Sequence, residues 1–306
     1  MKLEIKDIKK SFGDKEILKG ISFSVESGKA LGLLGRNGAG KTTTIRVLMD
    51  VFHANSGEIL LDGKKFQPRK VQIGYLPEER GLYPKRTVME QMVYLARLRG
   101  VAKQQAVGNA KKWLDRMGMS EYQTVLLEKL SKGNQQKVQL ASTLVCDPEI
   151  VILDEPFSGL DPVNSQILQE VVRELIADGK IVIFSSHQMS YVEEFCEEVV
   201  IINHGEVVLS GNLDEIKREF GKDQLVLSGV ELTAQETETF VKEELGSMVE
   251  VTGTTKDDVI VRLNERTGRK ELLKKIVEAA QFDVEHFETY KPSLNDIFVA
   301  KVGEEA

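Results

Sequence analysis

The residues whose types and spacing could carry chemistry begin with the segment GRNGAGKTT, residues 35–43. Gly35, Gly40, Lys41 and Thr42 fill the fixed positions of a pattern of glycine, four free positions, then glycine, lysine and serine or threonine. Glycines let the backbone wrap a phosphate chain, and the helix that follows adds the positive end of its dipole. Lysine brings a cation to the β and γ oxygens, and the threonine hydroxyl suits Mg²⁺. The pattern predicts a nucleoside triphosphate site.

Two adjacent carboxylates, Asp154 and Glu155, follow a short apolar segment at residues 150–153. Such a segment is typical of a strand buried in a parallel sheet. Carboxylates at its tip are costly to desolvate without a counter-charge, which Mg²⁺ on a triphosphate would supply. His187 follows the next predicted strand, residues 180–184, so we expect it at the same edge of the sheet. A lone histidine is usually structural, and only this placement favours a functional one.

Two weaker candidates accompany these residues. Ser131 opens a breaker-free helix in LSKGNQQKVQLASTLV, whose amino terminus suits an anion, although such a serine is more often a plain N-cap. Phe12 lies in the turn SFGDKE. A lone aromatic there is either a core plug or a stacking face for a base.

The elements that must position these residues predict an α/β fold with a parallel sheet. Residues 30–34 form a strand before the phosphate loop, and residues 43–49 begin a helix after it. Flanking segments predict antiparallel strands, an inserted helical region and a later helix at Pro162 that turns Val163 and Leu175 to one face. The supporting segments are strands within 3–25, a hairpin at 56–66, a strand at 73–76, helices at 88–99 and 103–117, strands at 199–202 and 207–209, and a helix at 213–220.

A second domain is predicted from residue 221 to 306, after a first domain of residues 1–220. Its elements follow the order β-α-β-β-α-β, which indicates a small ferredoxin-like α+β domain. They are strands at 224–227, 248–253, 258–263 and 282–290, and helices at 234–245 and 269–280. No convergent catalytic set occurs there. A structural or dimer-stabilising role is favoured over ligand sensing, and the fold alone does not decide between them.

Composition narrows the function classes. The chain has 306 residues, 29% of them charged, and a net charge of -7, which disfavours DNA or RNA as the main partner. No signal-peptide core and no run of about 18 apolar residues occurs, so we expect a cytoplasmic protein. Cys146 and Cys196 lie among apolar neighbours without metal-ligand spacing, which predicts buried, unpaired thiols.

Across about residues 1–220 these pieces resemble the nucleotide-binding domain of ABC transporter ATPases. The motifs that carry the resemblance are GRNGAGKTT as Walker A, LSKGNQQ as a variant signature motif, VILDEP as Walker B, SGLD as the D-loop and His187 as the switch histidine. Their order makes the resemblance specific. It implies a P-loop NTPase core that binds ATP and Mg²⁺.

The resemblance also implies the chemistry of individual residues. Asp154 would order Mg²⁺ together with Thr42, and Glu78 stands at the Q-loop position, where it could bind the metal or a water. Glu155 would polarise the attacking water. His187 would contact the γ-phosphate.

The remaining family roles concern nucleotide binding. Phe12 would stack on adenine. Ser131 and Gly133 of the signature motif would reach the γ-phosphate held by the opposite subunit of a homodimer, where Asp161 of the D-loop also belongs. The residues of the phosphate loop itself would be Gly35, Asn37, Gly38, Gly40, Lys41, Thr42 and Thr43.

The sequence departs from the family pattern at two motifs. Lys132 and Asn134 stand where the usual LSGGQ signature has a glycine and a glutamine, and Glu78 stands where the Q-loop has glutamine. The GYLPEERGLYP form and the later PSLNDIF segment look like the subfamily of bacterial sodium-efflux (NatA-like) and antibiotic-efflux ATPases.

The predicted function is therefore an ATPase subunit that dimerises and drives a separate multi-span membrane permease from the cytoplasmic face. Its cargo would be an ion such as sodium or a drug-like compound. The alternative is a soluble ABC ATPase acting on ribosomes or DNA, which a second Walker A or long heptad repeats would favour; neither occurs. A small-molecule kinase would need a phosphoacceptor pocket that no segment identifies.

Overall fold

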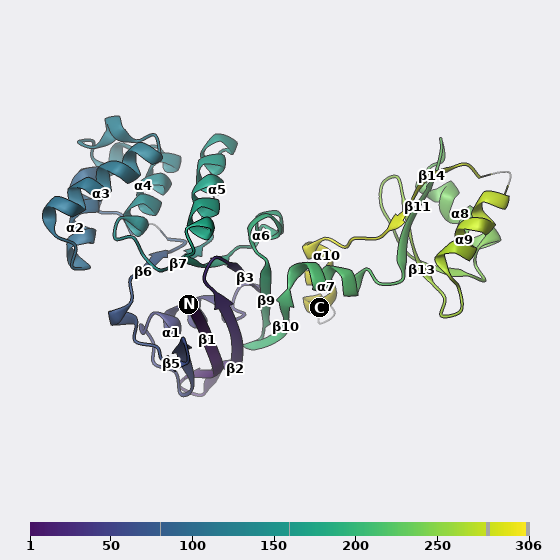
Figure 1. Cartoon of the computed structure of the whole chain (residues 1–306), viewed down its shortest axis with the longest axis horizontal. Coiled ribbons are helices and arrows are strands. Elements are labelled where there is room, and N and C mark those ends of the chain that lie inside the picture. Colours follow the sequence, from purple (N-terminus) through teal and green to yellow (C-terminus); the bar gives the residue numbers. More distant parts are fainter. Residues whose placement is uncertain (80, 159, 280–281, 304–306) are drawn as a thin grey trace. The chain divides into compact units, whose positions relative to one another are not determined.

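The protein forms two compact units, shown in a computed structural model (Figure 1). One unit comprises Met1–Leu213 with residues 301–303, and the other comprises Asp214–Ala300. The described residues are 1–79, 81–158, 160–279 and 282–303. Gly159 of the SGLD turn and Ala280 at the end of a predicted helix lie outside them. The domain boundary after residue 220 stays a prediction.

A mostly parallel sheet lies at the centre of the first unit. In their order across the sheet, its strands are β10 (Glu206–Asn212), β9 (Glu198–Asn203), β3 (Ala30–Leu34), β8 (Ile181–Ser185), β7 (Ile150–Asp154) and β6 (Ile73–Leu76). β10 is antiparallel to β9, and the other neighbours are parallel. Every residue of β3, β7 and β8 is buried. Their short apolar runs therefore form central strands, as predicted.

An antiparallel sheet shares an apolar core with the parallel one. Its strands, in order, are β2 (Lys15–Glu26), β1 (Lys2–Phe12), β4 (Ser56–Leu61) and β5 (Lys64–Lys65). Asp62 and Gly63 both have positive φ in the turn between β4 and β5, which confirms the predicted hairpin. Ile5 of β1, Ile45 of α1 (Lys41–Leu48) and Ile152 of β7 belong to one buried cluster. The helix after the phosphate loop is thus held by both sheets.

The inserted region is helical, as predicted. Figure 1 shows α2 (Val88–Leu98), α3 (Lys103–Arg116) and α4 (Lys132–Leu144) close together. A capping box, recognisable in the sequence as Thr-x-x-Glu, begins α2: the Glu90 backbone N donates to Thr87 Oγ1 at 3.2 Å, and the Thr87 backbone N donates to Glu90 Oε2 at 3.0 Å. Short 3₁₀ turns lie at Pro68–Lys70, Ser120–Tyr122 and Leu127–Lys129.

The helix predicted at Pro162 is α5 (Pro162–Ala177), and its buried face differs from the prediction. Leu168, Val171 and Leu175 are buried, whereas Val163 is 71% exposed. Val163 lies about 120° around the helix from Leu175, so the two cannot share one face. Placing Val163 on the core face was wrong.

Two short helices remain. α7 (Leu213–Phe220) matches the helix predicted at 213–220, and all but its first residue belong to the second unit. α6 (Met189–Phe195) was not predicted, although Val192 and Phe195 anchor it in the core. Its seven residues span about two turns, which is too short for a clear helical period.

The second unit confirms the predicted β-α-β-β-α-β order. Its sheet runs β12-β13-β11-β14, and every strand pair is antiparallel. The rings of Phe240 and Phe282 stack at 4.1 Å within its apolar core. The elements are β11 (Gln224–Gly229), α8 (Ala234–Glu244), β12 (Val249–Thr254), β13 (Val259–Leu263), α9 (Arg269–Glu278) and β14 (Val284–Thr289).

The last helix, α10 (Leu294–Val302), was not predicted. A capping signal precedes it: the Asp296 backbone N donates to Ser293 Oγ at 3.2 Å, and the Ser293 backbone N donates to Asp296 Oδ2 at 2.9 Å. Pro292 sits just before this pair. A serine followed three residues later by an acid was therefore the signal that could have found α10.

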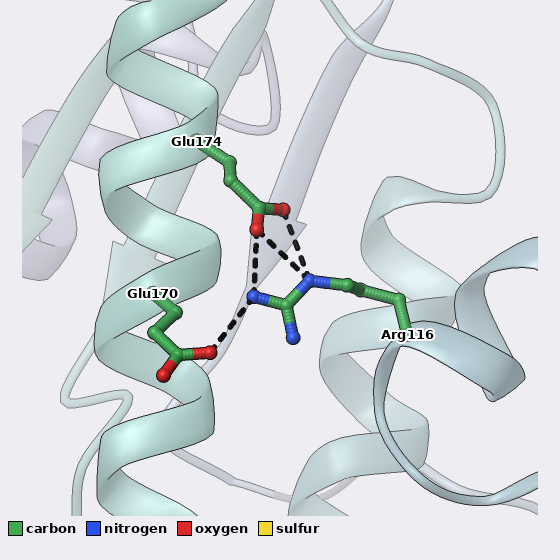
Figure 2. A network of polar contacts seen from close by, with 3 residues as sticks. All are labelled: Arg116, Glu170 and Glu174. Atoms are coloured by element: carbon green, nitrogen blue, oxygen red, sulfur yellow. Dashed lines mark hydrogen bonds and ion pairs between the residues drawn. The ribbon is translucent and has the colours of Figure 1, made fainter.

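A charged network ties α3 of the helical region to α5 of the core (Figure 2). Arg116 Nε and Nη2 donate to Glu174 Oε1 at 2.9 and 2.6 Å, and Nη2 also donates to Glu170 at 3.1 Å. The hydrogen bonds to Glu174 raise the pKa of Arg116. A bidentate guanidinium fixes the relative orientation of two helices better than a single contact would.

We expect a double-mutant cycle of Arg116→Ala and Glu174→Ala to give a coupling energy of about 0.5–1 kcal/mol in the free energy of unfolding. The pair is partly exposed, so the coupling should fall as salt is raised. Chemical denaturation measures it. Lys111→Ala, on the same helix, is the matched control and should show no coupling with Glu174. Equal coupling energies for both pairs would contradict a specific interaction between Arg116 and Glu174.

Candidate functional site

The phosphate loop lies between β3 and α1. Two of its positions must be glycine, because neighbouring residues leave no room there for a Cβ atom. A Cβ at Gly35 would lie 2.4 Å from the Ile202 carbonyl oxygen, a contact that no side chain could make. Gly40, the N-cap of α1, has a φ of 117°, and its Cβ would lie 2.8 Å from Leu18. The loop is therefore folded tightly against the sheets at two points, which shapes the backbone that precedes the helix.

Lys41 stands at the first position of α1 and bends back over the loop. Its Nζ donates to the carbonyl oxygen of Gly35 at 2.6 Å. Burial lowers the pKa of Lys41, and the charges of Glu155, Asp154 and Glu78 oppose that shift. The structure thus brings the predicted lysine within electrostatic reach of the predicted acids.

Asp154 ends β7 and is only 5% exposed. Ser185 Oγ, from the neighbouring strand β8, donates to Asp154 Oδ1 at 2.6 Å, and Tyr75 OH of β6 donates to Oδ2 at 3.4 Å. Burial, reinforced by the charge of Asp154, raises the pKa of Tyr75 to about 12, so the phenol remains a donor. Hydroxyl donors from both neighbouring strands therefore hold this carboxylate in place.

Glu155 follows at the tip of the strand and is 8% exposed. Its φ of 50° lies in the left-handed region, which is uncommon for a residue other than glycine. His187 Nδ1 lies 2.8 Å from Glu155 Oε2, and Ser186 Oγ donates to the same oxygen at 3.3 Å. The predicted acid and histidine are in direct contact.

The donor set suits a nucleotide-bound Mg²⁺ better than a metal held by protein alone. In the described part of the chain, no group of three or more His, Cys, Asp or Glu side chains is placed to hold a metal ion. Mg²⁺ usually takes one or two carboxylates, with phosphates and waters completing its shell. Asp154 is a buried carboxylate whose contacts are hydroxyl donors, and Thr42 offers an exposed hydroxyl on α1. These residues fit such an ion.

The predicted signature and D-loop residues form a second cluster. Ser131 is the N-cap of α4 and accepts from the Asn134 backbone N at 3.3 Å. Gly133, in the first turn, is pressed against the start of α5: a Cβ there would lie 2.7 Å from Asn164 Nδ2. Asp161 caps α5 by accepting from the Asn164 backbone N at 3.0 Å, and this hydrogen bond lowers the pKa of Asp161.

The two clusters are joined through α4 rather than by direct contact. Gln136 Nε2 donates to the Pro156 carbonyl oxygen at 3.0 Å, next to Glu155. No contact between Ser131 and Lys41 is found among the residues that the structure describes. Both helix starts are positioned within one subunit, and the structure does not bring them together on one phosphate.

Phe12 and Glu78 are the remaining predicted site residues. Phe12, at the end of β1, is 45% exposed, and its ring packs edge-to-face on Phe52 at 5.1 Å. It is therefore not a core plug. Glu78 is exposed just after β6, where its charge acts on Lys41. The nearby Gln139 Nε2 donates to the carbonyl oxygens of Pro77 and Glu79, which supports this loop from α4.

Sequence reasoning missed the residues that position the two acids: Tyr75, Ser185 and Ser186. The signal lay in strand pairing, because Asp154 and Ser185 are register partners at the carboxyl ends of β7 and β8. Polar residues that end neighbouring parallel strands meet at one edge. The buried thiols of Cys146 and Cys196 are as predicted.

A glycine-rich loop leads into a helix that begins at Lys41, and two acids follow the end of a parallel strand nearby. This arrangement defines a P-loop nucleoside triphosphatase. Comparisons narrow the class. A family model described as "ABC transporter" matches residues 18–158, and one described as "ATP-binding protein DrrA1-3-like, C-terminal domain" matches residues 211–302. The chain is 41% identical to the ABC transporter ATP-binding protein YhaQ of Bacillus subtilis, over 98% of each chain.

A second relative and a solved structure indicate the same family. The linearmycin resistance ATP-binding protein LnrL of Bacillus subtilis is 35% identical over 74% of this chain and 76% of that protein. A solved ATP-binding subunit of an ABC transporter matches with a TM-score of 0.66 and 30% identity, over 72% of this chain and 94% of that one. The chain belongs to the family of ABC transporter ATP-binding proteins, which hydrolyse ATP. The fold and the enzyme class predicted from the motifs are confirmed.

Glu155→Gln should retain ATP binding and slow hydrolysis at least ~10²-fold, because the amide keeps the size of the side chain and removes the base. Nucleotide titration and phosphate release measure the two effects separately. Lys41→Ala is the contrasting variant and should weaken ATP binding itself. Normal turnover by Glu155→Gln would remove Glu155 from this role.

Proposed function

We propose that this ATP-binding subunit dimerises, hydrolyses Mg²⁺-ATP at sites shared between subunits, and powers a separate membrane permease from the cytoplasmic face. The observation that carries the proposal is the pairing of Glu155 with His187 beside the phosphate loop. The resistance named in LnrL supports efflux of a drug-like compound, and an ion such as sodium is the other candidate cargo. No helix in the described residues is long and apolar enough to span a bilayer.

Each residue of the site has a role in this proposal. The backbone of the phosphate loop and Lys41 hold the phosphates, and Phe12 stacks on adenine. Glu155 takes the proton of the attacking water, and His187, held by Glu155, contacts the γ-phosphate. Bound Mg²⁺ would neutralise charge on the phosphates. Its protein ligands would be Thr42, Asp154 and Glu78.

Shared sites follow from the exposed start of α4. Ser131 and Gly133 lie at a helix amino terminus that the Ser131 hydroxyl caps. In the described part of the chain, no contact joins this terminus to Lys41 of the same subunit. A two-fold dimer would let each signature loop meet the phosphate loop of its partner. The second domain, residues 221–306, would then serve as an accessory to this dimer.

Mixing two inactive variants tests the shared site. Lys41→Ala and Ser131→Arg homodimers should each lack activity, because both sites of each dimer carry a lesion. In a mixed dimer both lesions fall on one site and the other is intact. Random exchange should restore about a quarter of wild-type ATPase activity if the sites act independently.

The measurement is the ATPase rate against mixing ratio, with subunit exchange confirmed by a labelled chain. Obligatory cooperation between the sites would lower the restored fraction. Full activity of the Ser131→Arg homodimer would show that the signature loop is not part of the site.

An apolar cavity on the helical region supports a permease as partner. It has a volume of about 810 Å³, and we call it the α2 groove because most of its lining lies on that helix. Tyr83 and Tyr94 line it with their rings 6.0 Å apart, and Leu98 is 65% exposed beside them. Exposed aromatic and aliphatic groups of this kind mark protein interfaces.

A buried polar atom also points to a partner at the α2 groove. Gln91 lines the groove and is 1% exposed. Its Oε1 accepts from the Tyr83 backbone N at 2.7 Å, while its Nε2 has no acceptor among the described residues. A buried donor without an acceptor is costly, and a carbonyl of a docked segment would satisfy it once the side chain is uncovered. The groove begins a few residues after Glu78, so docking there could reach the nucleotide site.

Capture from detergent-solubilised membranes should recover a multi-span membrane protein. Tyr94→Glu with Leu98→Glu should abolish that recovery and leave ATPase activity without the partner unchanged, because charges would be buried in the interface. Val277→Glu, at an exposed position of α9, is the control. Recovery of ribosomes or DNA in place of a membrane protein would favour the soluble alternative.

A further inference from the structure

A second cavity, of about 680 Å³, lies within the second unit and has a positively charged lining. We call it the basic cavity. Its walls come from α7 and the turn that follows, from the start of α9 and from the end of β14. The cationic residues of its lining are Lys217, Arg218, Lys222, Arg269 and Lys291. Asp214 is the acidic residue that the described lining contains.

This concentration of positive charge runs against the composition of the unit. Acidic residues outnumber basic ones across Asp214–Ala300, and the whole chain carries a net charge of -7. Cations gathered within a Debye length repel one another and destabilise the fold unless an anion offsets them. A bound anion would therefore reduce the repulsion among the cations of the basic cavity.

The cavity is also fixed in shape. Arg269 Nη1 donates to Thr289 Oγ1 at 2.8 Å, which holds the guanidinium across the gap between α9 and β14. A Cβ at Gly221 would lie 2.3 Å from the Tyr290 carbonyl oxygen, so the turn after α7 presses against the end of β14. This close approach keeps Lys222 and Lys291 on one cavity instead of on separate surfaces.

The side-chain chemistry selects among anions. Guanidinium groups bind phosphate oxygens through two parallel N–H donors, and lysine ammonium groups add point charges around them. A cavity of this volume lies in the range of small-molecule sites. We propose that the basic cavity binds a phosphate-bearing anion, either the headgroup of an anionic phospholipid or a soluble oligophosphate.

Two probes on the full chain test the proposal and separate the sources. The first is inorganic pyrophosphate, titrated calorimetrically in a Lys41→Ala background so that the phosphate loop contributes little. The second is a phosphatidylcholine vesicle containing phosphatidylglycerol, compared with pure phosphatidylcholine in a flotation assay. The test variant combines Lys222→Gln, Arg269→Gln and Lys291→Gln.

A matched control keeps the same change in charge outside the cavity: Lys256→Gln, Lys274→Gln and Lys275→Gln. We expect the test variant to weaken binding to at least one probe by about tenfold or more, and the control to bind like the unmodified cavity. Thermal unfolding and ATP hydrolysis of both triple variants, made with Lys41 intact, check that each is folded.

Each outcome either supports or overturns the proposal that the basic cavity binds a phosphate-bearing anion. Cavity-dependent binding of pyrophosphate alone assigns a soluble oligophosphate, and cavity-dependent flotation alone assigns a lipid headgroup. Cavity-dependent binding of both supports the shared chemistry. Equal losses in the test and control variants, or no binding to either probe by the intact cavity, overturn the proposal. Should the triple variant fail to fold, Lys291→Gln alone must still weaken binding, since Lys291 makes no contact that holds the fold in the described structure.

Discussion

Two carboxylates at the end of β7 are buried so deeply that less than a tenth of either residue meets solvent. A charge in that position is tolerated only with hydrogen bonds and a counter-charge. Ser185 and Tyr75 supply donors to Asp154, His187 pairs with Glu155, and Lys41 supplies positive charge from α1. The requirement to satisfy these acids explains why residues from distant segments converge on one edge of the sheet.

The parallel sheet makes that convergence possible. Strands β3, β7 and β8 are adjacent and parallel, so the loops that follow them leave at the same edge. The phosphate loop, the acid pair and the serine-histidine segment are those loops. The register of the strand pairs sets the relative heights of these loops, and Glu155 Oε2 lies 2.8 Å from His187 Nδ1.

The inserted helices connect this edge to surfaces further away. α4 contacts Pro156, next to the acids, through Gln136. It meets α5 through the close approach of Gly133 to Asn164, and it supports the Glu78 loop through Gln139. Arg116 ties α3 to the same α5 (Figure 2). These contacts connect the helical region to both ends of α5 and to the segment that follows the acids.

The sequence by itself determined the local features: the phosphate loop, the capping box at Thr87, the buried strands and the element order of the second unit. Each depends on the period or spacing of residues close together in the chain. Only the tertiary structure decided which groups meet across long separations. Tyr75 with Asp154, Gly133 with Asn164, Arg116 with Glu174 and the walls of the basic cavity are such cases. The short helix α6 was also not predicted from the sequence, because two turns held by core contacts show too little periodicity to be recognised.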